Sequence, residues 1–259
     1  GERSGLTRDE DETPEDGERF GSALDMLAHR GPDDRGVFNE QGILLGHRRL
    51  SIIDLSSGGH QPMRDRVSGA VIVFNGEIFN YVELRRDLLA LGHRFRTKSD
   101  TEVIVHAYEQ WGETAFERFN GQWALALWDA GRERLVLSRD RLGVRPLYLC
   151  EHRNRLYFAS EVKAIFAADR TIPRSLDPVG LEETFTFWTV IPPQSVFEGV
   201  TELPPAHTRT YADGRHQESC YWQPTYPRVR ADGTVEHPFT GSPAEAAEAD
   251  GPGAPTPAL

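Results

Sequence analysis

Apolar residues follow two different spacings along the chain, and each spacing predicts its own kind of element. Short runs rich in apolar and β-branched residues predict strands. These runs cover residues 37–38, 43–45, 50–53, 70–74, 123–128, 135–138, 147–150 and 156–159. Apolar residues at helical spacing predict helices over residues 18–28, 82–91 and 101–111. Strands and helices are mixed rather than strictly alternating, which favours an α+β fold with largely antiparallel sheets.

Capping residues mark where the predicted helices begin. Asn80 is an N-cap candidate for the second helix, and Asp177, followed by proline, is one for a further helix. Ser99 and Glu102 have the spacing of a capping box ahead of the third helix. Asp100 therefore lies in the first turn of that helix, near the positive end of the helix dipole.

Composition divides the chain into four segments. Residues 1–17 form a polar, acidic lead segment, and residues 18–190 carry most of the predicted elements. Residues 191–228 are proline-rich with short apolar runs, as in a linker. Residues 229–259 hold almost no large apolar side chain, so this tail is expected to be disordered because it cannot bury enough surface to order itself.

Charge and hydropathy narrow the class of protein. The 259 residues carry a net charge of −11, which argues against a nucleic-acid partner because such partners bind an excess of Lys and Arg. No apolar run approaches the roughly 20 residues that span a bilayer, and no secretory leader is visible, so we expect a cytoplasmic protein without a membrane partner. Two cysteines make no disulfide framework, and Cys150 is expected to be a buried thiol. We identify no metal-ligating motif, and the sequence does not indicate the oligomeric state.

One segment, Val73-Phe74-Asn75-Gly76-Glu77-Ile78-Phe79-Asn80, carries candidate chemistry because an apolar strand leads there into Asn-Gly-Glu. Asn75 can donate through its side chain, and Gly76 allows its backbone to approach a ligand closely. Two such donors side by side can form an oxyanion hole. Glu77 offers an acceptor for a cationic group. The competing interpretation is a hairpin turn, since Asn-Gly is the strongest short hairpin signal.

Further blocks lie before and after this segment. They are His29-Arg30-Gly31-Pro32-Asp33-Asp34, Gly46-His47-Arg48-Arg49-Leu50-Ser51-Ile52-Ile53-Asp54, Gln61-Pro62-Met63, Ser99-Asp100-Thr101-Glu102, Asn120-Gly121, Arg139-Asp140-Arg141-Leu142-Gly143-Val144-Arg145-Pro146-Leu147-Tyr148 and Phe158-Ala159-Ser160-Glu161. In this order and spacing the blocks resemble the glutaminase domain of class II glutamine amidotransferases, and more narrowly the amino-terminal half of the glutamine-hydrolysing asparagine synthetases. The resemblance covers about residues 19 to 225. It implies the four-layer αββα sandwich of the N-terminal-nucleophile hydrolases.

The resemblance implies a glutamine pocket with a role for each block. Arg49 would bind the α-carboxylate, since a guanidinium suits a bidentate carboxylate pair. Glu77 and Asp100 would receive the α-ammonium, and Asn75 and Gly76 would stabilise the oxyanion. Taken singly, the three charged residues also fit a surface arginine, a turn residue and a helix-dipole carboxylate. The pocket would further be lined by Leu50, Ser51, Ile52 and Ile53.

The chain departs from the family pattern at both ends. The family nucleophile is an amino-terminal cysteine, whereas this chain begins Gly1-Glu2-Arg3-Ser4, so we expect the nucleophile and the first strand to be missing. No pyrophosphate-binding loop of a synthetase half is present either. ATP and Mg would belong to that half, and no cofactor is expected in this chain. We read the chain as a truncated form.

Two functions follow from these expectations. The first is the glutamine-hydrolysing half of an asparagine synthetase-like amidotransferase, an enzyme by family. In the complete protein it would release ammonia to a synthetase domain in cis for the ATP-dependent amidation of aspartate. The alternative is a catalytically silent binding or scaffold domain, as in β-lactam synthetase-like relatives. The block around His29 and the Arg139-Asp140 pair are predicted to be structural, holding loops near the pocket through charge pairing.

Overall fold

The computed structural model describes residues 14–40, 42–226, 228–229 and 235–236. The chain divides into one unit that runs to Trp222 and a second that begins at Gln223. The second unit contains an antiparallel pair, β12 (Arg228–Val229) and β13 (Val235–Glu236). Most of the segment predicted as a linker, 191–228, therefore belongs to the first unit. The tail predicted to be disordered lies almost wholly outside the described residues.

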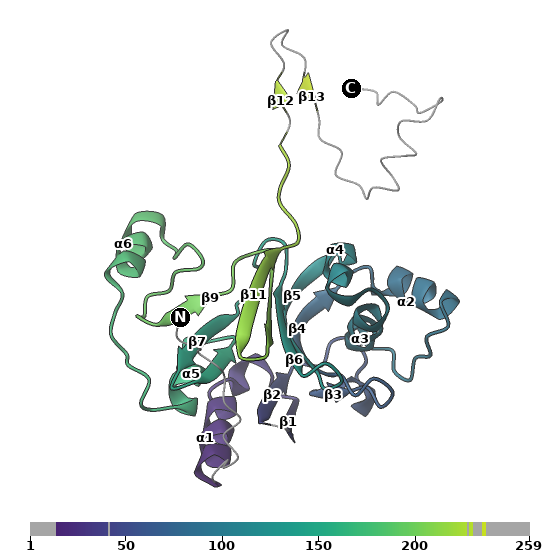
Figure 1. Ribbon diagram of the computed structural model, residues 1–259, viewed down its shortest axis with the longest axis horizontal. Helices are drawn as coiled ribbons and strands as arrows, with labels where there is room; N and C mark the ends of the chain where they lie inside the picture. The colour runs from purple at the N-terminus through teal and green to yellow at the C-terminus, as the bar shows by residue number, and fades with distance from the viewer. Residues whose placement is uncertain (1–13, 41, 227, 230–234, 237–259) are drawn as a thin grey trace. The chain divides into compact units, whose positions relative to one another are not determined.

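The first unit is built on an antiparallel sheet of six strands in the described part of the chain, in the order β11-β10-β6-β5-β4-β3 (Figure 1). The long strands of its centre match the apolar runs of the sequence. β10 and β11 are not predicted, because their side chains are mostly polar; in β10 only Thr208 and Tyr211 are buried, and all of β11 is exposed. The strands are β3 (Met63–Arg64), β4 (Val71–Ile78), β5 (Gly121–Asp129), β6 (Arg134–Arg139), β10 (His207–Ala212) and β11 (Arg215–Cys220).

Two smaller sheets face the large one. One pairs β1 (Asp34–Glu40) with β2 (Ile43–Arg49), and the other has the order β8-β7-β9. An apolar cluster that includes Leu45, Ala126, Leu137 and Leu149 packs the small sheets against the large one. The strands of the second small sheet are β7 (Tyr148–His152), β8 (Arg155–Ala159) and β9 (Val200–Glu202).

Helices cover the outer faces of both sheet layers. On the large sheet, α3 packs its apolar side against strand residues such as Ile72 and Phe74 to form the largest core cluster. α1 and α5 lie against each other beside the small sheets (Figure 1). This arrangement confirms the α+β sandwich. The helices are α1 (Pro14–Asp25), α2 (Tyr81–Ala90), α3 (Asp100–Trp111), α4 (Ala115–Arg118), α5 (Val162–Ala168) and α6 (Pro178–Phe187), with 3-10 turns at Ala28–Arg30, Ser57–Gly59 and Gly112–Thr114.

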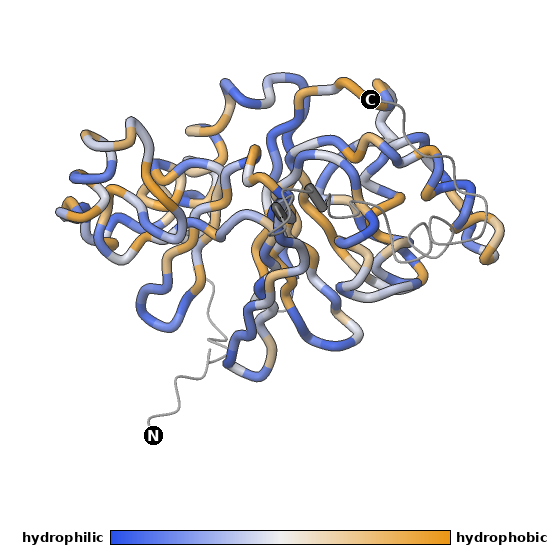
Figure 2. Tube along the Cα trace, turned by 90° about the horizontal axis from the view of Figure 1, so that it is seen from above, coloured by the Kyte–Doolittle hydropathy of each residue, from blue (hydrophilic) through white to orange (hydrophobic). Residues whose placement is uncertain are grey.

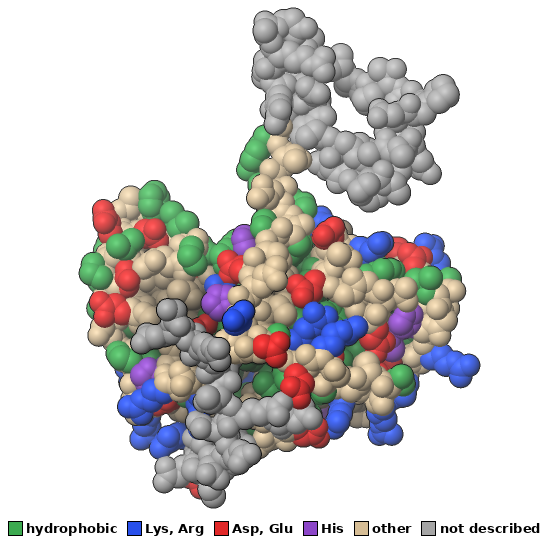
Figure 3. Space-filling model, viewed as in Figure 1, with side chains coloured by type: hydrophobic (Ala, Val, Ile, Leu, Met, Phe, Trp, Pro, Cys, Tyr) green, Lys and Arg blue, Asp and Glu red, His purple; other side chains and the backbone are tan. Residues whose placement is uncertain are grey.

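The surface of the unit matches its composition. Figure 2 shows that projecting hairpin ends and loops are largely hydrophilic, whereas apolar segments gather in the packed strands and helices. Figure 3 shows acidic and basic side chains interspersed on one face of the molecule. No helix among the described residues is long and apolar enough to cross a membrane.

The predicted helix caps are confirmed at two positions, but the predicted capping box is wrong. Asp177 caps α6 by accepting hydrogen bonds from Val179 N and Gly180 N, as predicted. Ser99 caps α3 through Thr101 N, but Glu102 turns away from the predicted capping box. Its carboxylate accepts instead from the backbone of Arg96 and Thr97.

The strand predicted over residues 50–53 is wrong. β2 ends at Arg49, and the following residues form an irregular loop in which Leu50 is 54% and Ile52 69% exposed. The apolar composition of the run favours a strand, but a side chain holds the backbone at its end in a loop. The carbonyl oxygen of Ile53, the last residue of the run, and that of the next residue, Asp54, accept hydrogen bonds from the side chain of Arg49.

Candidate functional site

Asn75 and Gly76 lie inside β4 and not at a hairpin turn. They pair with Ala124 and Trp123 of β5, and the strand continues through Ile78. The hairpin interpretation is therefore wrong, and so is the expectation that the strand ends at this motif. The reason is the long partner strand, which continues the ladder past the point where the apolar run stops.

The free edge of β4 carries backbone groups that side chains satisfy. β3 pairs only with Val71 and Ile72, so the edge beyond is open. The Phe74 N–H donates to Gln61 Oε1 at 2.6 Å, and the Ile78 N–H donates to Asp100 Oδ2 at 3.1 Å. Because strand positions alternate with a period of two, the N–H of Gly76 points to the same edge, between these two anchors.

Gly76 is required by packing as well as by any chemistry. Its φ of +155° lies in a backbone region that residues other than glycine rarely adopt. A Cβ atom there would come within 2.0 Å of the carbonyl oxygen of Gln122 on β5. The glycine thus lets the two strands approach closely.

Glu77 and Asp100 come together at the end of β4. Asp100 is buried at the first turn of α3, where its carboxylate anchors Ile78 N. Burial, and secondarily the charge of Glu77, raises the pKa of Asp100 above its ordinary value. A carboxylate beside Asp100 at this position favours a cation between the two groups.

Arg49 is buried at the end of β2 and organises the loop that follows. Its guanidinium donates to the carbonyl oxygens of Ile53, Asp54 and Ser56. Of the roughly five N–H donors of a guanidinium, these bonds use both on Nη2 and one on Nη1. The N–H on Nε and the second one on Nη1 are not used by them. Arg49 packs against Gly59, where a Cβ would meet its Nη2 at 2.0 Å.

The sequence blocks converge on this loop through side-chain to backbone bonds. Asp33 accepts from Ser51 N at 2.8 Å, and Asp54 accepts from Lys98 N at 3.0 Å. Lys98 leads directly into Ser99 and Asp100, so the loop after β2 is tied to the start of α3. The structure thus joins three of the predicted blocks into one region. It leaves most of the predicted lining residues exposed or half-buried, Ile52 and Leu50 above all.

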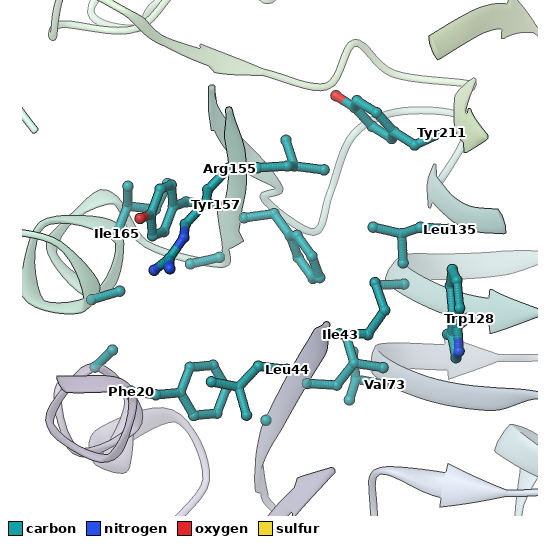
Figure 4. Close-up of a pocket in the computed structure, with 18 of the residues that line it drawn as sticks. Phe20, Ile43, Leu44, Val73, Trp128, Leu135, Arg155, Tyr157, Ile165 and Tyr211 are labelled. Carbon is teal, nitrogen blue, oxygen red and sulfur yellow. The ribbon is translucent and has the colours of Figure 1, made fainter. Parts of the chain in front are cut away.

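A cavity of about 1120 Å³ lies between the sheet layers (Figure 4). Natural interiors hold few voids larger than a water molecule, and engineered apolar cavities of about 150 Å³ are already large. Ile43 and Leu44 of β2 line one side, and Arg155 and Tyr157 of β8 line another (Figure 4). Among the described residues β2 pairs only with β1, and β8 only with β7, so each presents an unpaired edge.

His47 and Asn75 bring buried polar atoms to this cavity. His47 donates from Nε2 to the carbonyl oxygen of Phe74 at 3.0 Å, which leaves Nδ1 as a bare acceptor. His47 Nδ1 and Asn75 Nδ2 are buried without a hydrogen-bond partner in the structure. Burial lowers the pKa of His47 to about 4, so the ring is neutral at physiological pH. One unpaired acceptor and one unpaired donor therefore face the same space.

The blocks predicted to be structural do hold loops. Asp140 accepts hydrogen bonds from the backbone N–H groups of Trp123, Leu142, Val144 and Arg145. Its neighbour is buried and paired with a glutamate, Arg139 Nη2 lying 2.9 Å from Glu202 Oε1. Glu161 accepts from His29 and Arg30 at 2.8 and 3.2 Å, although this group is partly exposed rather than buried.

The sequence contained the signal for His47, but the prediction did not use it. Residues 47 and 49 share one face of a strand because positions alternate, so a histidine two residues before Arg49 belongs to the same face. What the sequence could not supply was the packing of β2 over β4, which buries the ring against the carbonyl of Phe74.

Comparison with known proteins identifies the family. The sequence pattern of the glutamine amidotransferase domain matches residues 5–222. This chain belongs to that family. Asparagine synthetase [glutamine-hydrolyzing] 3 of Bacillus subtilis is 40% identical over 201 residues, which cover 76% of this chain and 32% of that protein. Amidase chry2 of Gibberella zeae is 36% identical over 217 residues, which cover 81% of this chain and 31% of that protein.

Solved structures agree on the fold. Glutamine phosphoribosylpyrophosphate amidotransferase of B. subtilis superimposes with a TM-score of 0.57 at 18% sequence identity, over 83% of this chain and 50% of that one. This likeness shows the fold alone. The amidotransferase domain described here spans about a third of the length of the asparagine synthetase and amidase relatives that it matches.

Proposed function

We propose that this amidotransferase domain binds glutamine in the region between the end of β4, the start of α3 and the loop after β2. The observation that carries the proposal is the pair of neighbouring carboxylates, Glu77 and Asp100, beside the open edge of β4 that presents the Gly76 N–H. An α-ammonium suits the carboxylates. The remaining N–H groups of Arg49 suit the α-carboxylate, with the amide of Asn75 and the N–H of Gly76 near the reacting carbonyl.

Hydrolysis of glutamine also needs a nucleophile. We propose that an apolar strand carrying an amino-terminal cysteine fills the cavity between β2 and β8. Each of these strands has an unpaired edge there, and a strand could extend both small sheets into one. The polar groups of its backbone would also give His47 Nδ1 and Asn75 Nδ2 the partners that they lack.

In the complete protein, the cysteine thiolate would attack the side-chain amide of glutamine, and ammonia would leave as the acyl-enzyme forms. We propose that a synthetase domain in cis uses this ammonia to amidate aspartate, with ATP and Mg bound by that domain. The similarity to glutamine-hydrolysing asparagine synthetases supports this assignment. Cytoplasm is the expected compartment.

Glutamine-induced stabilisation tests the binding site. Glutamine should raise the Tm of the domain, because a ligand that binds only the folded state stabilises it by mass action. Arg49→Ala and Asp100→Asn should each abolish this shift. Arg48→Ala is the matched control, since the neighbouring arginine pairs with Asp25 at 2.9 Å and not with the site. A shift that survives both site variants would place the ligand elsewhere.

One observation favours the alternative, a silent scaffold domain. The guanidinium of Arg49 already holds three loop carbonyls, which is a sufficient structural role for this residue. In that case glutamine produces no shift in the wild-type domain at any concentration. A chain extended at its amino end by an apolar strand that begins with cysteine separates the two functions. It should hydrolyse glutamine if the site is a glutaminase site, and remain inactive if it is a scaffold.

A further inference from the structure

A second group of polar side chains lies away from the candidate glutamine site, where the turn after α2 meets the last turns of α3. His93 belongs to the turn, whereas His106 and Glu109 lie on α3 three residues apart. Ligand atoms of these three residues all lie within 4.8 Å of one another. We propose that His93, His106 and Glu109 form a binding site for a divalent transition-metal ion, with Zn²⁺ as the expected occupant.

The three ligands converge on one carboxylate oxygen. Glu109 Oε2 lies 2.7 Å from His106 Nδ1 and 3.6 Å from His93 Nδ1. Zinc binds histidine nitrogen and carboxylate oxygen at about 2.0–2.2 Å, so ligand atoms around it stand roughly 3.3–3.5 Å apart. The observed separations bracket that value, and small side-chain rotations about an ion would bring them to it.

Each histidine directs its other ring nitrogen toward an oxygen acceptor. His93 Nε2 lies 3.0 Å from Gln110 Oε1, and His106 Nε2 lies 3.8 Å from Glu102 Oε1. Metal-ligating histidines almost always donate their second N–H in this way, which fixes the tautomer and the ring orientation. If Nε2 carries the proton on each ring, both Nδ1 atoms present lone pairs to the centre of the group.

That arrangement leaves a lone pair of His106 facing a carboxylate lone pair at 2.7 Å. Two acceptors at that distance repel unless a positive centre lies between them, either a proton or a metal ion. A proton satisfies only this pair. A metal ion also satisfies His93 Nδ1, and it can draw on Glu109 Oε1, which is buried without a hydrogen-bond partner in the structure.

The surroundings shield the site from most of the solvent. His106 is 6% exposed, and the ring of Phe95 packs edge-on against it with centroids 4.8 Å apart. Glu102 is itself held by backbone N–H groups of Arg96 and Thr97, so the residue behind His106 is fixed. Three protein ligands leave a fourth position for water. The ion would pin the turn after α2 to α3, the helix that carries Asp100.

Metal binding to the metal-free chain, without an added histidine tag, tests the proposal. After dialysis against Zn²⁺ and removal of the excess, the wild-type chain should retain one Zn²⁺ per molecule, and Zn²⁺ should raise its Tm. Co²⁺ should give visible absorption bands of a low-symmetry site. His93→Gln and Glu109→Gln should each lose the bound metal and the Tm shift. Glu102→Gln should weaken binding about 10- to 100-fold, as expected for an outer partner of a ligating histidine.

His152→Gln is the matched control, because this histidine is exposed and bonded to Thr171 instead. It should bind Zn²⁺ as the wild type does. The variants that keep side-chain shape, Glu109→Gln and Glu102→Gln, guard against a loss that reflects unfolding, provided that far-UV circular dichroism is unchanged. Absence of a bound metal in the folded wild type, or equal metal content in wild type, His93→Gln and Glu109→Gln, would overturn the proposal and leave a proton as the shared centre.

Discussion

The half-buried histidine beside the cavity makes the stability of this domain depend on pH in a defined window. His47 has a pKa of about 4 in the folded protein, against its ordinary value of 6.5 in an unfolded chain. Between these values the unfolded state binds more protons than the folded state. The contribution of His47 to the free energy of unfolding is therefore fully present above about pH 6.5, and it is lost as the pH drops toward 4.

The size of the effect follows from the same shift. A change from 6.5 to about 4 corresponds to about 3 kcal/mol in total, because one pKa unit is worth about 1.4 kcal/mol. At pH 5 the loss is about 2 kcal/mol, since the folded state is still almost wholly neutral there. The free energy of unfolding of a protein domain is roughly 5–15 kcal/mol in all, so a loss of this size is measurable.

A substitution that cannot titrate isolates the contribution of this one residue. His47→Gln keeps a side-chain N–H for the carbonyl of Phe74 and removes the ionisable ring. Urea unfolding of wild type and variant at pH 7.5, 6.5, 5.5 and 5.0 should show that the wild type loses about 2 kcal/mol more than the variant between pH 7.5 and 5.0.

His152→Gln should behave as the wild type, because that histidine is exposed. The reasoning is refuted if the wild type and His47→Gln lose the same free energy over this range. That result would mean that the ring of His47 is hydrated in solution, through water that enters the cavity.

The remaining predictions concern the strand centre, the loop anchor and the chemistry. Gly76→Ala should destabilise the domain by at least about 2 kcal/mol in urea unfolding, because its Cβ would meet the carbonyl of Gln122; Gly131→Ala, with an ordinary 3.5 Å contact, should be nearly neutral. Asp140→Asn should cost about 2–4 kcal/mol, since it weakens four charge-assisted backbone bonds at once; an unchanged midpoint would contradict that role. The chain as printed should release no ammonia from glutamine above a heat-inactivated control. Its buried thiol, Cys150, has a pKa raised by burial and is no substitute nucleophile, so release proportional to protein concentration would contradict this prediction.

The sequence predicted the elements whose burial follows a regular pattern and missed those set by long-range pairing. β4 to β8 carry apolar runs and were found. β10 and β11 are mostly polar, yet Asp213-Gly214 between them is a strong hairpin signal that would have located them. Their place in the sheet is decided by pairing with β6 about 70 residues earlier. No local pattern reports such a partner.

The apolar run 50–53 shows the opposite error. Its composition favours a buried strand, but a single buried arginine outweighs that preference by taking the carbonyl groups of the loop. An unsatisfied buried guanidinium would cost about 3–5 kcal/mol, and satisfying it offsets the exposure of Leu50 and Ile52, each of which forgoes part of about 1.5–3 kcal/mol. Arg49 is predicted as a ligand-binding residue, and no local pattern indicates that it also organises the loop.

Gly76 also has both a packing role and a candidate chemical role, so a substitution there cannot separate the two. Its close contact with β5 is a packing requirement, and its N–H lies on the open edge between the Gln61 and Asp100 anchors. A substitution at this position therefore perturbs the sheet before it perturbs any oxyanion donor. Asn75 separates the two effects, because its Nδ2 is buried and unpartnered. Replacing that amide by an apolar group of similar size relieves an unpaired donor and leaves the ladder intact. An Asn75→Leu variant that is as stable as the wild type, but defective in an active extended chain, would assign the amide to chemistry and not to folding.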